Sequence, residues 1–174
     1  EVTKLALLLQ VLEDETRETL GKQLALFNEP ALPNLDANIQ CGNALIGTDC
    51  FAGQLLPDKE ALRRVNPFDW TRGFANVMRE GGFDCVIGNP PYIRIQTMKE
   101  WAPLEVELYK EKYAAARAGN YDIYVVFVEK GLSLLKPGGR LGFILPHKFF
   151  NAQYGAPLRE LIARGKHLAH VVHF

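Results

Sequence analysis

The sequence predicts an α/β fold, a three-layer sandwich in which helices cover a mostly parallel β-sheet. Three short apolar runs, residues 83–88, 140–145 and 167–174, have the composition of strands. Segments with helical spacing of their apolar residues separate these runs. Strands that are joined through helices pair in parallel by right-handed crossovers, which place the helices on the faces of the sheet. Ligands of such sheets bind beyond the carboxyl ends of the strands.

The region before the first predicted strand is expected to be helical or irregular. Residues 1–27 mix apolar and charged positions at helical spacing, which predicts one or two amphipathic helices. A short extended segment is expected at residues 38–41. Residues 56–69 predict a polar loop, and a helix is expected over residues 70–78. The glycines at 81 and 82 are typical of a helix C-terminal stop.

The run Phe83–Gly88, F-D-C-V-I-G, is rich in strand formers and is bounded by glycines. This pattern predicts a strand buried on both faces, in which Cys85 is a small core residue. The charged residues 97–118 that follow are expected to form a surface insertion.

The rest of the chain repeats the alternation of helix and strand. Residues 121–135 place apolar side chains on one helical stripe, and the K-P-G-G segment at 136–139 predicts a turn. A buried strand is expected over residues 140–145, a helix over 157–164 and a third strand over 167–174.

Composition limits the classes of protein. With 174 residues and 48% apolar content, the chain can form one packed domain. Its apolar runs are too short to cross a bilayer, so we expect a cytoplasmic protein without membrane contact. Three cysteines without C-x-x-C spacing indicate neither a disulfide framework nor a zinc site.

The charge balance and the first residue bear on partners. Twenty basic and twenty acidic residues give no global positive field. If the substrate is a nucleic acid, we expect its main binding contacts to lie outside these residues. The sequence begins at Glu1 and its earliest methionine is Met78, so we expect it to be part of a longer polypeptide.

The segment N-P-P-Y directly after the first predicted strand carries the chemical argument. The lone pair of an exocyclic aromatic amine is delocalised into its ring, so two oxygen acceptors for the N–H bonds would make the nitrogen a better nucleophile. The Asn89 side chain can supply one oxygen and the Pro90 carbonyl the other. Pro91 restricts the backbone in advance, and Tyr92 offers a ring for stacking an extruded base.

This chemistry requires no general base, because the amine becomes acidic only after it has gained the methyl group. Asp84 is therefore not a catalytic candidate. The alternative interpretation of Asn89–Tyr92 is a rigid turn with an aromatic lid. The position of the segment at the end of a strand favours function.

These residues resemble a known family. F-D-C-V-I-G-N-P-P-Y is similar to motif IV of the amino-methyltransferases, N-I-Q-C-G-N-A-L-I-G to motif III of the gamma-class enzymes, and residues 121–146 to motifs V and VI. The likeness covers almost the whole chain. It indicates a gamma-class N6-adenine DNA methyltransferase of the type IIG restriction-modification kind, with a partial class I, Rossmann-like fold.

The resemblance implies roles for eight residues. Asn89, Pro90, Pro91 and Tyr92 would form the catalytic set, and S-adenosyl-L-methionine would be the cofactor. Asn43 falls where many relatives have an Asp that accepts from the adenine amine of the cofactor. Asp122, Tyr124 and Phe127 fall in a segment that lines the family's cofactor pocket, although core packing explains Phe127 about as well.

The resemblance also implies what the chain lacks. The glycine-bearing cofactor loop and the acidic residue that holds the ribose, with the first strands of the sheet, would precede Glu1. The glycines at 138 and 139 follow a helix and open a strand, the reverse of the required order. We therefore expect the isolated chain to be inactive and prone to self-association through open sheet edges. The partner of the whole protein would be double-stranded DNA, through a flipped adenine.

Other readings remain open. The same chemistry would serve methylation of a protein glutamine at N5 or of ribosomal RNA guanine at N2, and a non-catalytic scaffold is an alternative from another class. Arg94, His147 and Lys148 could meet phosphates or be plain surface charges. His167, His170 and His173 recur every third residue, but on a strand they would point to alternating faces, so no metal site is expected.

Overall fold

The structure, a computed structural model, describes residues 2–12, 35–51 and 58–173. The chain divides into two compact units, residues 1–41 and residues 42–174, which are described separately below. The second predicted helix of residues 1–27 falls outside the described residues.

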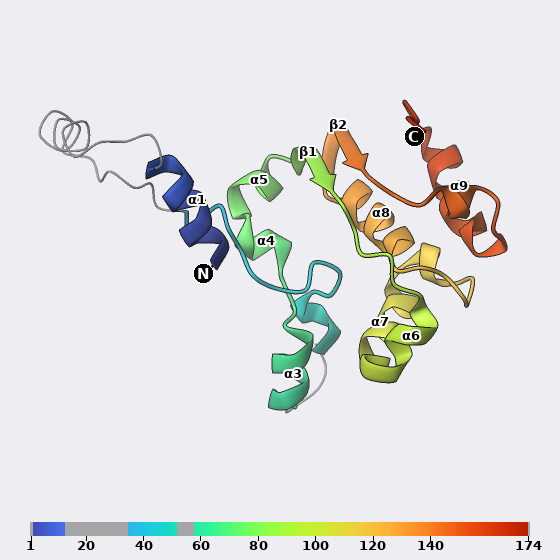
Figure 1. The fold of residues 1–174 in the computed structure, drawn as a ribbon, viewed down its shortest axis with the longest axis horizontal. Coiled ribbons are helices and arrows are strands. Elements are labelled where there is room, and N and C mark those ends of the chain that lie inside the picture. Colours follow the sequence, from blue (N-terminus) through green and yellow to red (C-terminus); the bar gives the residue numbers. More distant parts are fainter. Residues whose placement is uncertain (1, 13–34, 52–57, 174) are drawn as a thin grey trace, which may run out of the picture. The chain divides into compact units, whose positions relative to one another are not determined.

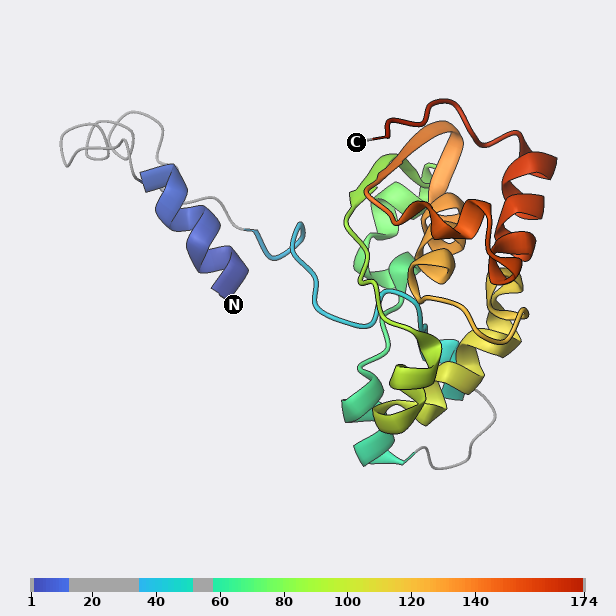
Figure 2. The ribbon, with the colours of Figure 1, turned by 45° about the vertical axis from the view of Figure 1, so that its right-hand side comes forward.

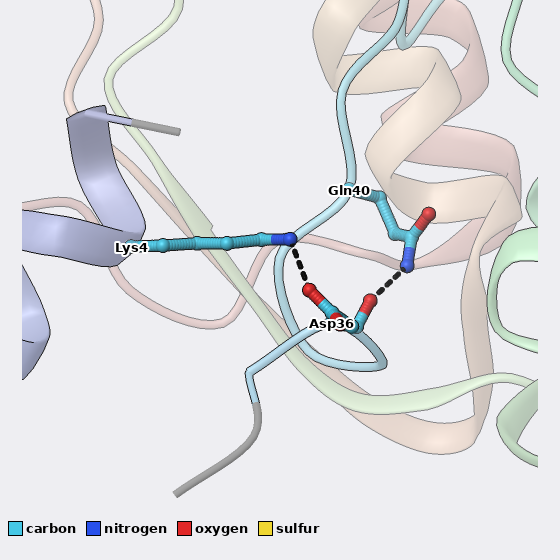
Figure 3. Close-up of polar contacts among 3 residues, drawn as sticks. All are labelled: Lys4, Asp36 and Gln40. Carbon is cyan, nitrogen blue, oxygen red and sulfur yellow. Dashed lines mark hydrogen bonds and ion pairs between the residues drawn. The ribbon is translucent and has the colours of Figure 1, made fainter. Parts of the chain in front are cut away.

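The first unit contains the helix α1 (Val2–Leu12), as the spacing predicts. Lys4 of this helix forms an ion pair with the Asp36 carboxylate, and the Gln40 side chain donates to the Asp36 carbonyl at 2.7 Å (Figure 3). Residues 36–38 form a turn and residues 39–41 are irregular, so the extended segment predicted at 38–41 does not form a strand. Two amides bond instead to the Leu35 carbonyl within the turn.

The second unit alternates short helices with two strands (Figure 1). In chain order its elements are η1 (Thr48–Phe51), α3 (Lys59–Val65), α4 (Trp70–Gly73), α5 (Ala75–Arg79), β1 (Phe83–Gly88), α6 (Ile95–Trp101), α7 (Pro103–Lys112), η2 (Ala114–Ala116), α8 (Tyr124–Ser133), β2 (Leu135–Phe143), η3 (His147–Phe150), η4 (Gln153–Gly155) and α9 (Ala156–Gly165).

The helix α3 was missed, because the prolines around it predicted a loop. Asp58 caps its first turn by accepting from the Glu60 amide at 2.9 Å, and Asn66 ends it in a left-handed conformation. The predicted helix at 70–78 forms as α4 and α5, with a break at Phe74. Gly82 follows with a φ of 121° and lies against the Leu134 carbonyl, where a side chain would not fit.

β1 and β2 pair in parallel, which confirms the α/β class and agrees with part of a Rossmann-like fold. Phe83 lies opposite Leu135 and Cys85 opposite Arg140, so β1 advances by two residues while β2 advances by five. The K-P-G-G segment expected as a turn is therefore a bulge inside β2. β2 begins at Leu135 and ends at Phe143, earlier at both ends than predicted.

β1 is not buried on both faces, which corrects the prediction. Cys85 is exposed, and Ile87 is 83% exposed. Leu141 and Phe143 of β2 pack against the core on the side of α8, whereas Cys85 and Ile87 of β1 remain exposed. A fully apolar strand sequence gives the tendency to be buried, but only a neighbouring layer can bury it.

The helices α6 and α7 occupy residues that were expected to form an insertion. With Ala102 between them, they contribute much of the core of the second unit through buried side chains: Ile95, Met98, Val106 and Tyr109. The helix α8 supplies Tyr124, Val125, Val126 and Val128. Whether residues 97–118 are inserted relative to other proteins stays a prediction.

The third predicted strand does not form. After α9, which confirms the helix predicted at 157–164, residues 167–173 run without regular structure (Figure 2). Val171 is 58% and Val172 80% exposed. Strand hydrogen bonds come from a neighbouring strand, and none lies beside this segment in the described part of the chain. Residue 174 lies outside the described residues.

No helix in the described ranges has both the length and the hydropathy to span a bilayer.

Candidate active site

The segment Asn89–Tyr92 lies at the carboxyl end of β1, where the chain leaves the sheet toward α6 (Figure 1). The Asn89 side chain is exposed. Pro90 is buried and Pro91 exposed. Asn89 is therefore not consumed by core packing, and its side-chain amide is accessible at the position that the sequence predicted.

The Tyr92 hydroxyl connects the tips of the two strands. It donates to the Asn89 Oδ1 at 2.6 Å and lies 2.9 Å from the carbonyl oxygen of Ile144, the first residue after β2. A phenol has one proton, so these two acceptors share it. The parallel pairing of β1 and β2 makes this contact, because it brings both carboxyl ends to the same edge.

The ring of Tyr92 is half exposed and has an aromatic neighbour behind it. Tyr92 is 50% exposed, and its ring meets that of Tyr124 edge to face at 6.3 Å. Tyr124 is fully buried and also contacts Phe149 edge to face at 6.2 Å. One part of the Tyr92 ring is thus fixed by packing while the rest remains accessible.

A chain of hydroxyl groups runs behind Tyr92. The hydroxyls of Tyr124 and Tyr154 lie 2.8 Å apart, and that of Tyr154 donates to the Asp122 carboxylate at 3.2 Å. Burial raises the pKa of both tyrosines, so each keeps its proton at neutral pH. Of the residues that the resemblance assigned to the cofactor, Tyr124 therefore contacts the Tyr92 ring, and Asp122 is linked to Tyr124 through the Tyr154 hydroxyl.

A backbone contact brings Asp122 to this place. Arg94 and Asp122 form an antiparallel bridge, flanked by hydrogen bonds from the Ile95 amide to Tyr121 and from the Ile123 amide to Ile93, each at 2.9 Å. The residues directly after the motif thus pair with the residues directly before α8. No local sequence pattern marks this pairing.

Tyr154 was missed by the sequence analysis, because its partners are distant in the chain. It lies in η4, and the chain at Gly155 passes so close to the Phe149 carbonyl that a side chain there would clash. The Arg159 guanidinium donates to the carbonyls of Phe149 and Ala152 at 2.6 and 2.8 Å. The one local signal for Tyr154 is its position directly before Gly155, at the start of α9.

The other two predicted cofactor residues lie elsewhere. Asn43 accepts from the Leu45 amide at 3.0 Å, and its side chain also hydrogen-bonds Tyr109, whose pKa burial raises to about 12. Phe127 is half-buried and packs against the core. The structure therefore brings together Asp122, Tyr124 and Tyr92, but neither Asn43 nor Phe127 takes part in their contacts.

The chemistry of these side chains fits part of S-adenosylmethionine. Asn43 and Asp122 are half-buried and carry oxygens that could accept from an amine or a ribose hydroxyl. Tyr124 fits less well, since it has no exposed surface and its hydroxyl is engaged.

Charged and titratable side chains near the motif are exposed. Arg94, His147 and Lys148 all reach solvent, and Asp84 pairs with Lys136, whose hydrogen bond lowers the pKa of that carboxyl. His173 meets His147 ring to ring at 5.7 Å. Within the described ranges, no three histidine, cysteine, aspartate or glutamate residues are grouped as metal ligands would be.

A cavity of about 620 Å³ lies elsewhere in the second unit. Phe68, Trp70, Lys112, Tyr113 and Lys130 are among the residues that line it. None of the eight predicted site residues does. This cavity and the predicted chemistry thus lie in different places, and we place the candidate site at Asn89, because there an exposed amide side chain and a half-exposed aromatic ring occur together.

Comparisons with known proteins place this geometry in context. The Eco57I restriction-modification methylase family matches residues 1–174. The chain is 38% identical over 168 residues to the type II restriction enzyme and methyltransferase RM.Eco57I of Escherichia coli, covering 97% of the chain and 15% of that protein. It is 44% identical over 89 residues to the type II methyltransferase M.PaeR7I of Pseudomonas aeruginosa, covering 51% of the chain and 15% of that protein.

A third relative, the type II methyltransferase M.XhoI of Xanthomonas vasicola, is 36% identical over 90 residues, covering 52% of the chain and 16% of that protein. The comparison with solved structures found no match. The chain spans roughly a seventh of the length of these curated relatives. The match of the family along all 174 residues shows that the chain belongs to the Eco57I restriction-modification methylases.

Proposed function

We propose that this chain carries the target-amine site of a DNA methyltransferase that uses S-adenosylmethionine to methylate the N6 amine of adenine within a restriction-modification system. One observation carries the proposal. The exposed residue Asn89 lies at the carboxyl end of β1, and its Oδ1 accepts a hydrogen bond from the hydroxyl of a half-exposed tyrosine. Family membership and the type II methyltransferase relatives support the reaction class.

The Asn89 Oδ1 and the Pro90 carbonyl act as acceptors for the two N–H bonds of the target amine. Accepting these bonds draws the nitrogen lone pair out of conjugation with the purine ring. The chemistry that S-adenosylmethionine supplies when bound is an electrophilic methyl group on a positively charged sulfur. Asn89 and Pro90 would hold the nitrogen with its lone pair free for that methyl group, and the methylated amine would release its surplus proton to water.

The Tyr92 ring is the stacking surface for the flipped base. Stacking on an aromatic side chain contributes about 1–3 kcal/mol per base, which offsets part of the cost of extruding the adenine from duplex DNA. Tyr124 supports the ring from the protein side, and Phe149 packs against Tyr124. Exposed Arg94 and Lys148 are candidates for contacts with the DNA backbone.

The residues proposed for the cofactor are Asn43 and Asp122, as oxygen acceptors, with Tyr124 and Phe127 in supporting positions. Two polar acceptors alone give weak binding. We therefore propose that the isolated chain neither holds the cofactor tightly nor methylates DNA, and that its exposed β1 face favours self-association.

The test is a methylation assay of the full-length protein with isotopically labelled S-adenosylmethionine. Duplex DNA, a glutamine-containing protein substrate and ribosomal RNA are offered in parallel, and labelled bases are identified by mass spectrometry. The expected product is N6-methyladenine in DNA. Label in glutamine or in guanine would assign one of the alternative reactions, and turnover by the isolated 174 residues would refute the proposed inactivity.

A further inference from the structure

The side-chain amide of Asn89 has two ends of similar shape and opposite chemistry. Its oxygen accepts hydrogen bonds and its nitrogen donates them. A target amine donates, so it binds productively only if the oxygen faces it. An exposed asparagine can rotate freely in solvent, and Asn89 is exposed. Something in the protein must therefore fix the orientation of this amide before the base arrives.

The Tyr92 hydroxyl is placed to do this. It lies 2.6 Å from the Asn89 Oδ1, so the oxygen, and not the nitrogen, of the amide points to the hydroxyl. The second neighbour of the hydroxyl is the Ile144 carbonyl at 2.9 Å, which only accepts. The hydroxyl is thus held at the end of β2 by one proton that the Ile144 carbonyl and the Asn89 Oδ1 share.

The two acceptors of this hydroxyl allow it to remain bound throughout the reaction. An amide oxygen has two lone pairs, so the Asn89 Oδ1 can accept from the target amine beside the hydroxyl. If the amine displaces the hydroxyl from the Asn89 Oδ1, the phenolic proton keeps the Ile144 carbonyl as its acceptor. The ring also keeps its edge contact with Tyr124, so its stacking surface does not move.

We propose that the Tyr92 hydroxyl is a positioning group that orients the Asn89 amide, separate from the role of the Tyr92 ring in stacking. This inference rests on the proposed function. It predicts that the site prefers a target base with an amine over a base with an oxygen at the same position. The preference depends on a hydroxyl that does not touch the base.

The test measures how the full-length protein binds two DNA duplexes, one with adenine and one with hypoxanthine at the target position. Hypoxanthine has an oxygen where adenine has its amine. In the Tyr92→Phe variant the ring remains and the hydroxyl is lost, so the preference for adenine should fall roughly three- to tenfold, the range for one hydrogen bond. The single-turnover methylation rate should fall by a similar factor.

The Asn89→Asp background separates orientation from packing. A carboxylate presents oxygen at both ends, so the hydroxyl has no orientation to choose there. Tyr92→Phe should then leave the ratio of adenine to hypoxanthine binding unchanged. The matched control is Tyr121→Phe, which removes a tyrosine hydroxyl that has no hydrogen-bond partner among the described residues and should leave the ratio at its wild-type value.

The outcomes are distinct. Wild-type protein without methyl transfer to DNA adenine would overturn the proposed function itself. Active wild-type protein with an unchanged ratio in Tyr92→Phe would overturn only the positioning role. An equal loss of preference in the Asn89→Asp background, or in the Tyr121→Phe control, would also overturn it, because a general packing effect would then explain the change.

Discussion

The two ends of β1 both carry aromatic clusters, yet they differ in what their polar groups do. At the amino end, Trp70 stacks on Phe74 at 5.7 Å and meets Phe83 edge to face at 5.8 Å. The Trp70 indole donates to the Ala44 carbonyl at 3.0 Å, which satisfies its only donor. The rings at this end therefore have no unused hydrogen-bond donor, although Trp70 also lines the cavity.

At the carboxyl end, Tyr92, Tyr124 and Phe149 form a similar set of edge contacts. Here, however, the Tyr124 hydroxyl bonds to that of Tyr154, and the Oδ1 of the exposed Asn89 shares the Tyr92 hydroxyl donor with a backbone carbonyl. The comparison teaches that aromatic clustering does not mark a ligand site by itself. Accessible acceptors with remaining hydrogen-bonding capacity distinguish the two ends.

The largest expected effect is that of Asn89→Ala at the carboxyl end. Loss of one acceptor that acts on the reacting amine should lower the methylation rate of the full-length protein by about 10²- to 10³-fold. The side chain is exposed, so the unfolding midpoint should stay near that of the wild type. Single-turnover kinetics and thermal unfolding measure the two quantities.

The matched control is Asn76→Ala, at the amino end. Asn76 is exposed on α5 and bonds to the Arg79 side chain of the same helix. Its replacement should leave the methylation rate unchanged. Equal rates for wild type and Asn89→Ala would contradict the acceptor role and favour the reading of the segment as a rigid turn.

Trp70→Ala tests the amino end. Truncation of a large, half-buried ring with three aromatic neighbours should reduce the free energy of unfolding by about 2–4 kcal/mol. The methylation rate per folded molecule should be preserved, because the ring does not reach the site. Urea denaturation, with activity normalised to the folded fraction, checks this. A loss of activity in fully folded Trp70→Ala protein would contradict the comparison, because the amino end of β1 would then also serve the reaction.

Tyr121→Phe should stabilise the protein. The Tyr121 carbonyl accepts from the Ile95 amide just after the motif, but its hydroxyl is buried and has no partner among the described residues. Removing an unsatisfied buried hydroxyl should raise the free energy of unfolding by about 1 kcal/mol. Denaturant unfolding measures the change. A loss of stability would mean that the hydroxyl makes a hydrogen bond in solution, for instance to a buried water.

The smallest effect is expected from Asp49→Asn, beside the cavity. A hydrogen bond from Lys112 lowers the pKa of the Asp49 carboxyl below its usual 3.8, so the pair stabilises the fold above that pH and the contribution is lost as pH falls further. Because the carboxylate is 71% exposed, the variant should lose less than about 0.5 kcal/mol at pH 7. The difference from wild type should shrink as pH falls below 3.8 and vanish once the carboxyl of the folded protein is protonated, which unfolding at several pH values and low salt can show.

Local sequence patterns predicted much of this architecture. The parallel pairing of β1 with β2 follows from the helices between them, and the location of Asn89 at a strand end follows from the glycine-bounded apolar run before it. The helix α3 was not predicted, because its cap at Asp58 lies between prolines that suggested a loop. Each of these predictions, right or wrong, rested on residues that lie close together in the sequence.

By itself, the sequence determined the α/β class, the family and the position of the motif at a strand end, because helical spacing, strand composition and the N-P-P-Y segment are local properties. The tertiary structure alone decided that Cys85 is exposed, that residues 167–173 form no strand, and that Tyr154 lies beside Asp122. It also decided that the Tyr92 hydroxyl is held by Ile144, 52 residues away. Burial and long-range hydrogen bonds depend on which segments become neighbours, and no short stretch of sequence specifies that.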